Sequence, residues 1–149
     1  MALDWKLVID CAEPLRLAEF WEAALGYRIE DHGPIIQNLL DQGLIDVEDF
    51  LPFRDGKVWR DLAAVRHPDD PVEPSTGTGL GRRLLFQAVP EPKLGKNRLH
   101  IDVHAAPGDR ESEVRRLTAL GARVLRTVSA KGGEHVTMAD PEDNEFDVR

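Results

Sequence analysis

The sequence predicts an α+β fold made of two tandem βαβββ modules, because one pattern of elements occurs twice along the chain. The tripeptide Ala-Leu-Gly occurs at 24–26 and again at 119–121, each time where a helical pattern ends. Each of these helices follows a short apolar strand that contains Ile-Asp, at 9–10 and at 101–102. Further strands follow each helix, so the chain reads as two copies of one unit. The strand–helix–strand pattern alone also permits a ferredoxin-like fold.

The first module begins with a strand at 7–11, a short apolar run rich in β-branched residues. Pro14 suits the first turn of a helix, and apolar residues then recur at helical spacing as far as Leu25. Gly26 is well suited to end that helix. Residues 27–30 alternate between apolar and polar side chains, which predicts a half-buried strand.

An insertion of about residues 34–80 interrupts the first module. Its first part, 35–50, contains two short apolar groups and predicts one or two short helices. Strand returns within 57–65, around Val58, Trp59, Leu62 and Ala64. Residues 67–81 hold several prolines and glycines, which predicts a loop. A last strand at 83–89 completes the module.

The second module repeats the order without an insertion. A strand at 97–104 is followed by a helix, for which Asp109 is the expected N-cap and Gly121 the stop. Residues 140–144 form the tight turn before the last strand. We treat residues 1–149 as a single domain, with module one at about 1–92 and module two at about 96–149. The remaining strands are predicted at 122–128, 135–139 and 145–148.

Alternation along the strands sorts the side chains onto two faces. The apolar set is expected to pack against helices on the outside. The other set is unusually rich in ionisable residues, and it lines a cup-shaped cavity if the curved mixed sheets curl. In the strand at 97–104 the apolar set is Leu99, Ile101 and Val103, and the ionisable set is His100, Asp102 and His104.

Composition excludes several classes of function. The 149 residues carry a net charge of −8 and no long run of Lys or Arg, whereas a polyanion partner needs a basic face, so we expect no nucleic-acid partner. No apolar stretch approaches the length of a membrane span, and the N-terminus has no basic region followed by an apolar run. The single cysteine, Cys11, cannot form an internal disulfide. These features predict a cytoplasmic protein without a membrane partner.

Three groups of motifs span nearly the whole chain. They are VIDCAEP (8–14), LAEFW (17–21) and LG (25–26) near the start, LLFQAVPEPK (84–93) and KNRLHID (96–102) at the centre, and DPEDNEF (140–146) near the end. In this order they resemble glyoxalase-like domain proteins of the vicinal oxygen chelate superfamily, which includes glyoxalases, bleomycin-resistance proteins and extradiol dioxygenases. The resemblance implies paired βαβββ modules around a small-molecule site and a homodimer.

The resemblance also implies a position for a divalent metal ion, held by one side chain from the first and last strand of each module. Carried over to this sequence, the four positions are Lys6, Gln87, His100 and Asp147. His100 and Asp147 are suitable ligands and Gln87 is a weak one. Lys6 is a cation without a lone pair at neutral pH, so it repels a metal and is expected to pair with Asp147 instead.

Three functions follow from this set. The first is a small-molecule-binding protein with a degenerate metal site and no metal, which takes Lys6, Gln87, Trp59 and His104 as ligand contacts. The second is a lyase, isomerase or dioxygenase that depends on Zn, Mn, Ni or Fe and acts on a small oxygen-bearing substrate.

In the second function His100, Asp147 and Gln87 hold the metal. The third function is a metal-free acid–base enzyme with His100 and either Asp147 or Lys6 as catalytic residues. Glyoxalase activity itself is not expected, because the glutamate bases of the superfamily are missing here. The sequence leaves open whether the protein is an enzyme, and it does not identify the ligand.

Overall fold

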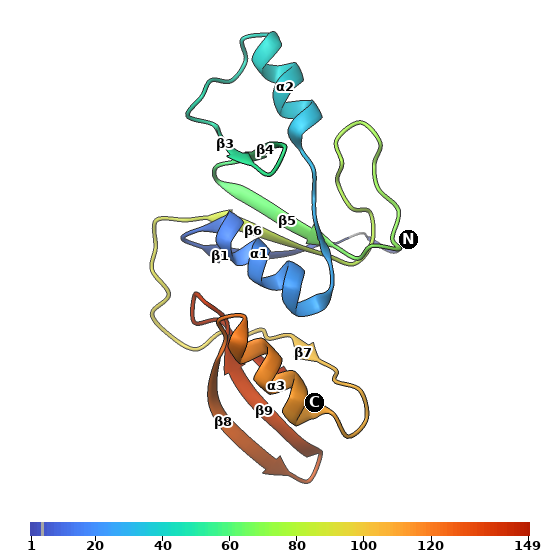
Figure 1. Cartoon of the computed structure of the whole chain (residues 1–149), viewed down its shortest axis with the longest axis vertical. Coiled ribbons are helices and arrows are strands. Elements are labelled where there is room, and N and C mark those ends of the chain that lie inside the picture. The colour runs from blue at the N-terminus through green and yellow to red at the C-terminus, as the bar shows by residue number, and fades with distance from the viewer. Residues whose placement is uncertain (4) are drawn as a thin grey trace. The chain divides into compact units, whose positions relative to one another are not determined.

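The computed structural model describes residues 1–3 and 5–149, and it has the predicted α+β class (Figure 1). The described chain contains three helices and ten strands. It divides into two compact units. Unit 1 comprises Met1–Glu22 and Gly26–Pro92, and unit 2 comprises Ala23–Leu25 and Lys93–Arg149.

Unit 1 contains a four-stranded mixed sheet with the order β1-β6-β5-β2. β1 and β6 are parallel, and β5 runs antiparallel to both of its neighbours. Parallel neighbours need a long crossover, which α1 and the following elements provide. The bounds are β1 (Leu7–Cys11), α1 (Pro14–Leu25), β2 (Arg28–Ile29), β5 (Leu62–Arg66) and β6 (Arg83–Ala88).

The first helix forms as its sequence predicts. Pro14 lies in its first turn, and Leu17 and Trp21 on its apolar side are 0% and 1% exposed. Gly26 ends the helix with φ +66°, a left-handed conformation that glycine adopts without a Cβ penalty. The predicted strand at 7–11 also has the observed bounds of β1.

The insertion differs in detail from its prediction. It contains one helix, α2 (Gly33–Asp41), which is within the predicted one or two, and an antiparallel hairpin of β3 (Phe50–Phe53) and β4 (Gly56–Trp59) that was not predicted. The strand predicted within 57–65 is therefore two strands, β4 and β5, with a break between them. The hairpin was missed although Asp55-Gly56 is a dipeptide typical of hairpin turns; Arg54, the first residue of the turn, adopts a positive φ of 51°.

A buried ion pair anchors the loop that precedes β6. Glu30 is 2% exposed, and Arg83 donates to both of its oxygens, from Nε at 2.6 Å and from Nη2 at 2.8 Å. The backbone N–H of Gly79 donates to the same carboxylate at 2.8 Å, and His32 Nε2 lies 3.2 Å from it. Because Gly79 belongs to the predicted loop at 67–81, this carboxylate ties that loop to the sheet.

Unit 2 repeats the topology of unit 1. Its sheet has the order β7-β10-β9-β8, so the first and fourth strands of the module are again parallel neighbours. This agreement confirms the βαβββ modules that the internal repeat predicts. The bounds are β7 (Asp102–Val103), α3 (Arg110–Ala119), β8 (Arg123–Ala130), β9 (Gly133–Ala139) and β10 (Glu145–Val148).

The strand predicted at 97–104 is much shorter than expected, because β7 has only two residues. The difference arises at Glu145 of β10, whose side chain binds the segment that precedes β7. The backbone N–H of Asn97 donates to Glu145 Oε2 at 2.9 Å, and Lys93 Nζ lies 3.1 Å from Oε1. Asn97 therefore uses a side-chain acceptor in place of a strand neighbour. Asp109 is the N-cap residue of α3 as predicted, although its side chain makes no capping hydrogen bond.

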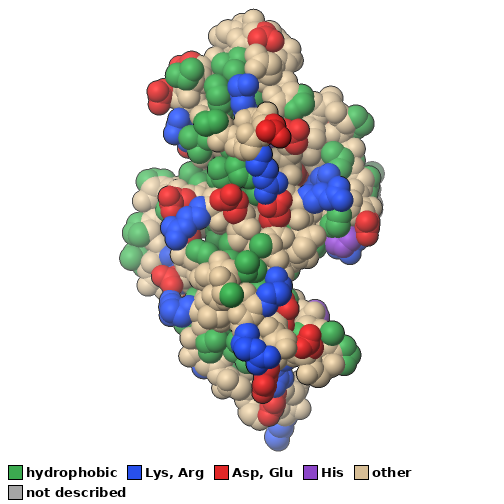
Figure 2. Space-filling view, viewed as in Figure 1, with side chains coloured by type: hydrophobic (Ala, Val, Ile, Leu, Met, Phe, Trp, Pro, Cys, Tyr) green, Lys and Arg blue, Asp and Glu red, His purple; other side chains and the backbone are tan. Residues whose placement is uncertain are grey.

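None of the described helices is long and apolar enough to cross a membrane. Acidic and basic side chains are interspersed on the face seen in Figure 2, and they form no continuous basic patch there. This distribution agrees with the acidic composition.

Candidate functional site

The candidate site lies on one face of the unit 2 sheet. Phe146 and Val148 of β10 are 1% and 0% exposed and belong to the apolar face. Alternation places Asp147 on the opposite face. There it lies level with Asp102 of the parallel strand β7 and with Thr137 of the antiparallel strand β9. The register of the sheet thus brings the side chains of Asp102, Thr137 and Asp147 together.

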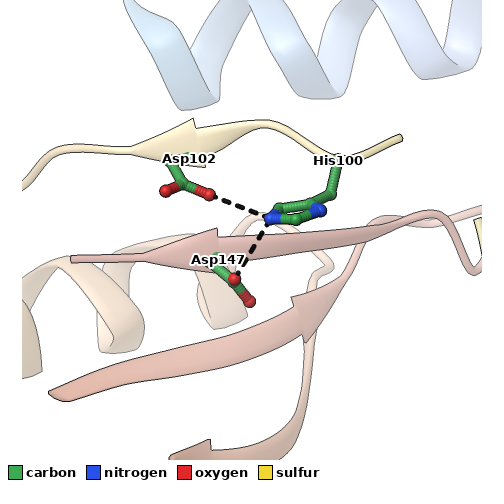
Figure 3. A group of neighbouring side chains, drawn as sticks. All are labelled: His100, Asp102 and Asp147. Atoms are coloured by element: carbon green, nitrogen blue, oxygen red, sulfur yellow. Dashed lines mark ion pairs between the residues drawn. The ribbon is translucent and has the colours of Figure 1, made fainter. Parts of the chain in front are cut away.

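His100 completes this group, as Figure 3 shows. It comes from the segment just before β7, and its Nε2 lies 3.3 Å from Asp102 Oδ1 and 3.5 Å from Asp147 Oδ2. One ligand atom from each of His100, Asp102 and Asp147 lies within 4.8 Å of the other two. We call these three residues the triad. Among the described residues, they form the one group of His, Cys, Asp and Glu with such spacing.

The spacing of the triad suits a divalent metal ion. Nitrogen and oxygen ligands lie about 2.0–2.2 Å from Zn²⁺, so neighbouring ligand atoms are about 3.0–3.6 Å apart around one ion. The two distances from His100 Nε2, 3.3 and 3.5 Å, fall in this range. One imidazole and two carboxylates are ordinary ligands for Zn, Mn and Fe. The residues therefore fit a metal, with coordination positions left for a ligand or water.

Asp147 is held in place from its other side. It is 8% exposed, and the Thr137 hydroxyl donates to its Oδ1 at 2.7 Å. That bond leaves Oδ2 facing His100. A second imidazole, His135 Nε2, lies 3.6 Å from the same Oδ2. Such outer hydrogen bonds orient metal-binding carboxylates and tune their affinity.

One cation contacts the triad directly. Arg149 follows β10, and its Nε donates to Asp102 Oδ2. Its backbone continues the pairing with β7, because its N–H donates to Val103 and its carbonyl accepts from Ala105. Asp102 therefore has one oxygen toward His100 and the other on a guanidinium.

Sequence reasoning selected His100 and Asp147, and the structure brings these two together. It named Asp102 only as a neighbour of His100, and it did not select Thr137 or Arg149. The signal for Asp102 was available, because it shares the face of His100 by alternation. The contribution of Thr137 depends on cross-strand register, which a single sequence does not reveal.

The strands of unit 1 offer no equivalent pair. In unit 2, His100 comes two residues before Asp102, and Asp102 is level with Asp147 on the neighbouring strand. In unit 1, Gln87 takes the place of Asp147 and is level with Asp10, so the residue in the place of His100 is Val8. If Lys6 is put in the place of His100 instead, the residue two positions later is Val8, and its level partner is an apolar leucine at position 85. In both alignments one of the two positions is apolar.

The other predicted ligand contacts are not among the three residues of the triad. Trp59 is half-buried in β4, where it is level with Phe50. His104 is exposed and is not one of the triad. Lys6 and Asp147 belong to different units, so their ion pair stays a prediction.

A sequence model described as the glyoxalase-like domain matches residues 6–149. The chain belongs to this family. The match covers both βαβββ modules and includes all three residues of the triad. A search of curated protein sequences gave no significant match.

Solved structures show the same fold for this glyoxalase-like protein. A glyoxalase/bleomycin resistance protein/dioxygenase family enzyme from Burkholderia phytofirmans PsJN has a TM-score of 0.59 and 11% identity, over 96% of this chain and 94% of that one. A point mutant of the fosfomycin resistance protein FosX from Listeria monocytogenes, complexed with Mn(II) and 1S,2S-dihydroxypropylphosphonic acid, has a TM-score of 0.61 and 9% identity. It is matched over 100% of this chain and 92% of that one.

FosX from Mesorhizobium loti is similar, with a TM-score of 0.58 and 11% identity over 100% of this chain and 91% of that one. These identities are low, so the likeness establishes the fold alone. The family match agrees with the resemblance to glyoxalase-like domain proteins that the sequence motifs carry.

Proposed function

We propose that this glyoxalase-like protein binds a divalent metal ion through His100, Asp102 and Asp147 and uses the site to hold a small oxygen-bearing molecule. The observation that carries the proposal is the convergence of three ligand atoms within 4.8 Å on one sheet face. Two carboxylates attract a cation, and the distances from His100 Nε2 to each of them are those of ligand atoms around a single ion.

The residues around the triad have separate tasks in this proposal. Asp147, buried and oriented by Thr137, supplies a fixed oxygen. His100 has a 44% exposed side chain, so the metal position adjoins solvent and a ligand can reach it. When bound there, a metal would polarise an oxygen of the ligand as a Lewis acid. That chemistry suits a lyase, an isomerase or a dioxygenase as well as a binding protein.

A metal-free binding protein is the second candidate. Arg149 favours it, because its guanidinium already neutralises Asp102. A metal-free site would bind its ligand by hydrogen bonds and charge alone.

Metal content separates the two candidates. Untagged protein, purified without chelator, is exposed in turn to Zn²⁺, Mn²⁺, Ni²⁺ and Fe²⁺, dialysed, and measured by elemental mass spectrometry. The variant is His100→Ala, and the matched control is His104→Ala, which removes an exposed histidine of the same segment.

We expect about one ion per chain in the wild type and in the control, and loss of the ion in His100→Ala. Circular dichroism spectra of all three proteins verify that they are folded. An ion that survives in His100→Ala would contradict the assignment of the triad. Folded wild-type protein that retains none of the four metals would overturn metal binding in favour of the metal-free candidate.

A further inference from the structure

Arg149 is the one described cation whose side chain contacts the triad, and its position is fixed by the sheet. Its N–H donates to the carbonyl of Val103 at 2.9 Å, and its carbonyl accepts from Ala105 at 2.9 Å. It comes two residues after Asp147, so alternation along the chain places both side chains on the same face. The guanidinium therefore stands beside the proposed metal position.

The guanidinium keeps donors to spare. Its Nε donates to Asp102, and no described acceptor takes a hydrogen bond from either terminal nitrogen. The side chain is 38% exposed, so these nitrogens are open to a ligand. Their four N–H groups are planar and match the two oxygens of a carboxylate.

We propose that Arg149 makes this an anion-selective site, whose ligand places a carboxylate on the guanidinium and an adjacent oxygen at the metal. The inference rests on the proposed metal function. The side chains of Asp102, Asp147 and Arg149 carry charges of −1, −1 and +1, so these three side chains sum to −1 before the metal binds. A divalent ion changes this to +1, and an anionic ligand then neutralises the site.

The alternative to ligand binding is that Arg149 serves only as the counter-charge of Asp102. The two roles differ in one measurable respect. A counter-charge acts on an anionic ligand only through its field, so Arg149→Lys, which keeps the charge, should then keep the whole preference for the charged ligand over its neutral analogue. A guanidinium that holds the carboxylate by two hydrogen bonds should lose part of that preference in Arg149→Lys.

The test uses glycolate, which carries a carboxylate beside a hydroxyl, and glycolamide, its neutral analogue of similar size. Each is titrated by calorimetry into metal-loaded wild type, Arg149→Ala, Arg149→Lys and a control, Arg123→Ala. Arg123 suits the control because it pairs with Asp143 on the surface of the same unit. Metal content is measured on every sample before titration.

We expect the wild type and Arg123→Ala to bind glycolate at least tenfold more tightly than glycolamide, as a charge-assisted hydrogen bond implies. In Arg149→Ala this preference should fall by about tenfold while metal affinity rises, because a neighbouring positive charge is gone. Arg149→Lys should keep part of the preference, because an ammonium lacks the bidentate geometry.

Failure of this inference is distinct from failure of the metal proposal. If the wild type holds metal and either Arg149→Ala or Arg149→Lys prefers glycolate as strongly as the wild type does, the guanidinium does not hold the carboxylate. A wild type that holds metal and has no preference for glycolate also overturns the inference. If the wild type holds no metal, the metal proposal fails, and the same titrations on metal-free protein decide the role of Arg149 by the same criterion.

Discussion

Replacement of Glu30 by Gln tests the buried ion pair that holds the loop of unit 1 on its sheet. Burial alone would raise the pKa of the Glu30 carboxyl. Hydrogen bonds from Arg83, His32 and the Gly79 N–H outweigh it, and they lower the pKa from 4.5 to about 2. Glu30→Gln keeps the size of the side chain but removes this charge, which leaves the Arg83 guanidinium buried without its counter-charge.

The pKa sets the size and the direction of the effect. A carboxyl whose pKa falls from 4.5 when unfolded to about 2 when folded stabilises the protein by about 3 kcal/mol at neutral pH. Because the folded pKa is the lower one, the stabilisation is complete above pH 4.5 and is lost as the pH falls toward 2. At pH 3 about 1 kcal/mol of it remains.

The assay is urea unfolding followed by tryptophan fluorescence, at pH 7 and at pH 3. Glu30→Gln should lower the free energy of unfolding by about 3 kcal/mol at pH 7 and by about 1 kcal/mol at pH 3. The control is Glu111→Gln, which removes an exposed carboxylate 3.9 Å from Arg115 and should cost less than about 1 kcal/mol. A loss for Glu30→Gln that is equal at the two pH values would refute the reasoning.

Two further predictions concern the site and the anchored loop. Thr137→Val removes the hydroxyl that donates to Asp147 Oδ1 at 2.7 Å. If Asp147 is a metal ligand as proposed, metal affinity should fall about tenfold to a hundredfold in a calorimetric titration, and an unchanged affinity would remove Thr137 from the site. Gly79→Ala would place a Cβ 2.8 Å from the Cβ of Arg66, so the urea midpoint should drop by an amount that corresponds to about 1–3 kcal/mol. Gly95→Ala meets nothing within 4 Å, and it should leave the midpoint unchanged.

The sequence by itself determined the elements whose signals are local. The strand Leu7–Cys11, the helix that begins at Pro14 and the last strand Glu145–Val148 have their predicted bounds or lie within a residue of them. Their periodicity, turn residues and helix ends act over a few neighbouring residues, so one sequence is enough to read them. The internal repeat then predicted how these elements are ordered into two βαβββ modules.

Only the tertiary structure decided which side chains meet. Asp102 and Asp147 are 45 positions apart in the sequence, yet the parallel pairing of β7 with β10 sets them level. The antiparallel pairing with β9 adds Thr137, and the continuation of β10 brings Arg149 to Asp102. Strand register depends on packing and hydrogen bonding across the whole sheet, and a shift of one residue would turn each of these side chains to the other face. The site is therefore a property of the register, and alternation along a single strand gave only its candidates.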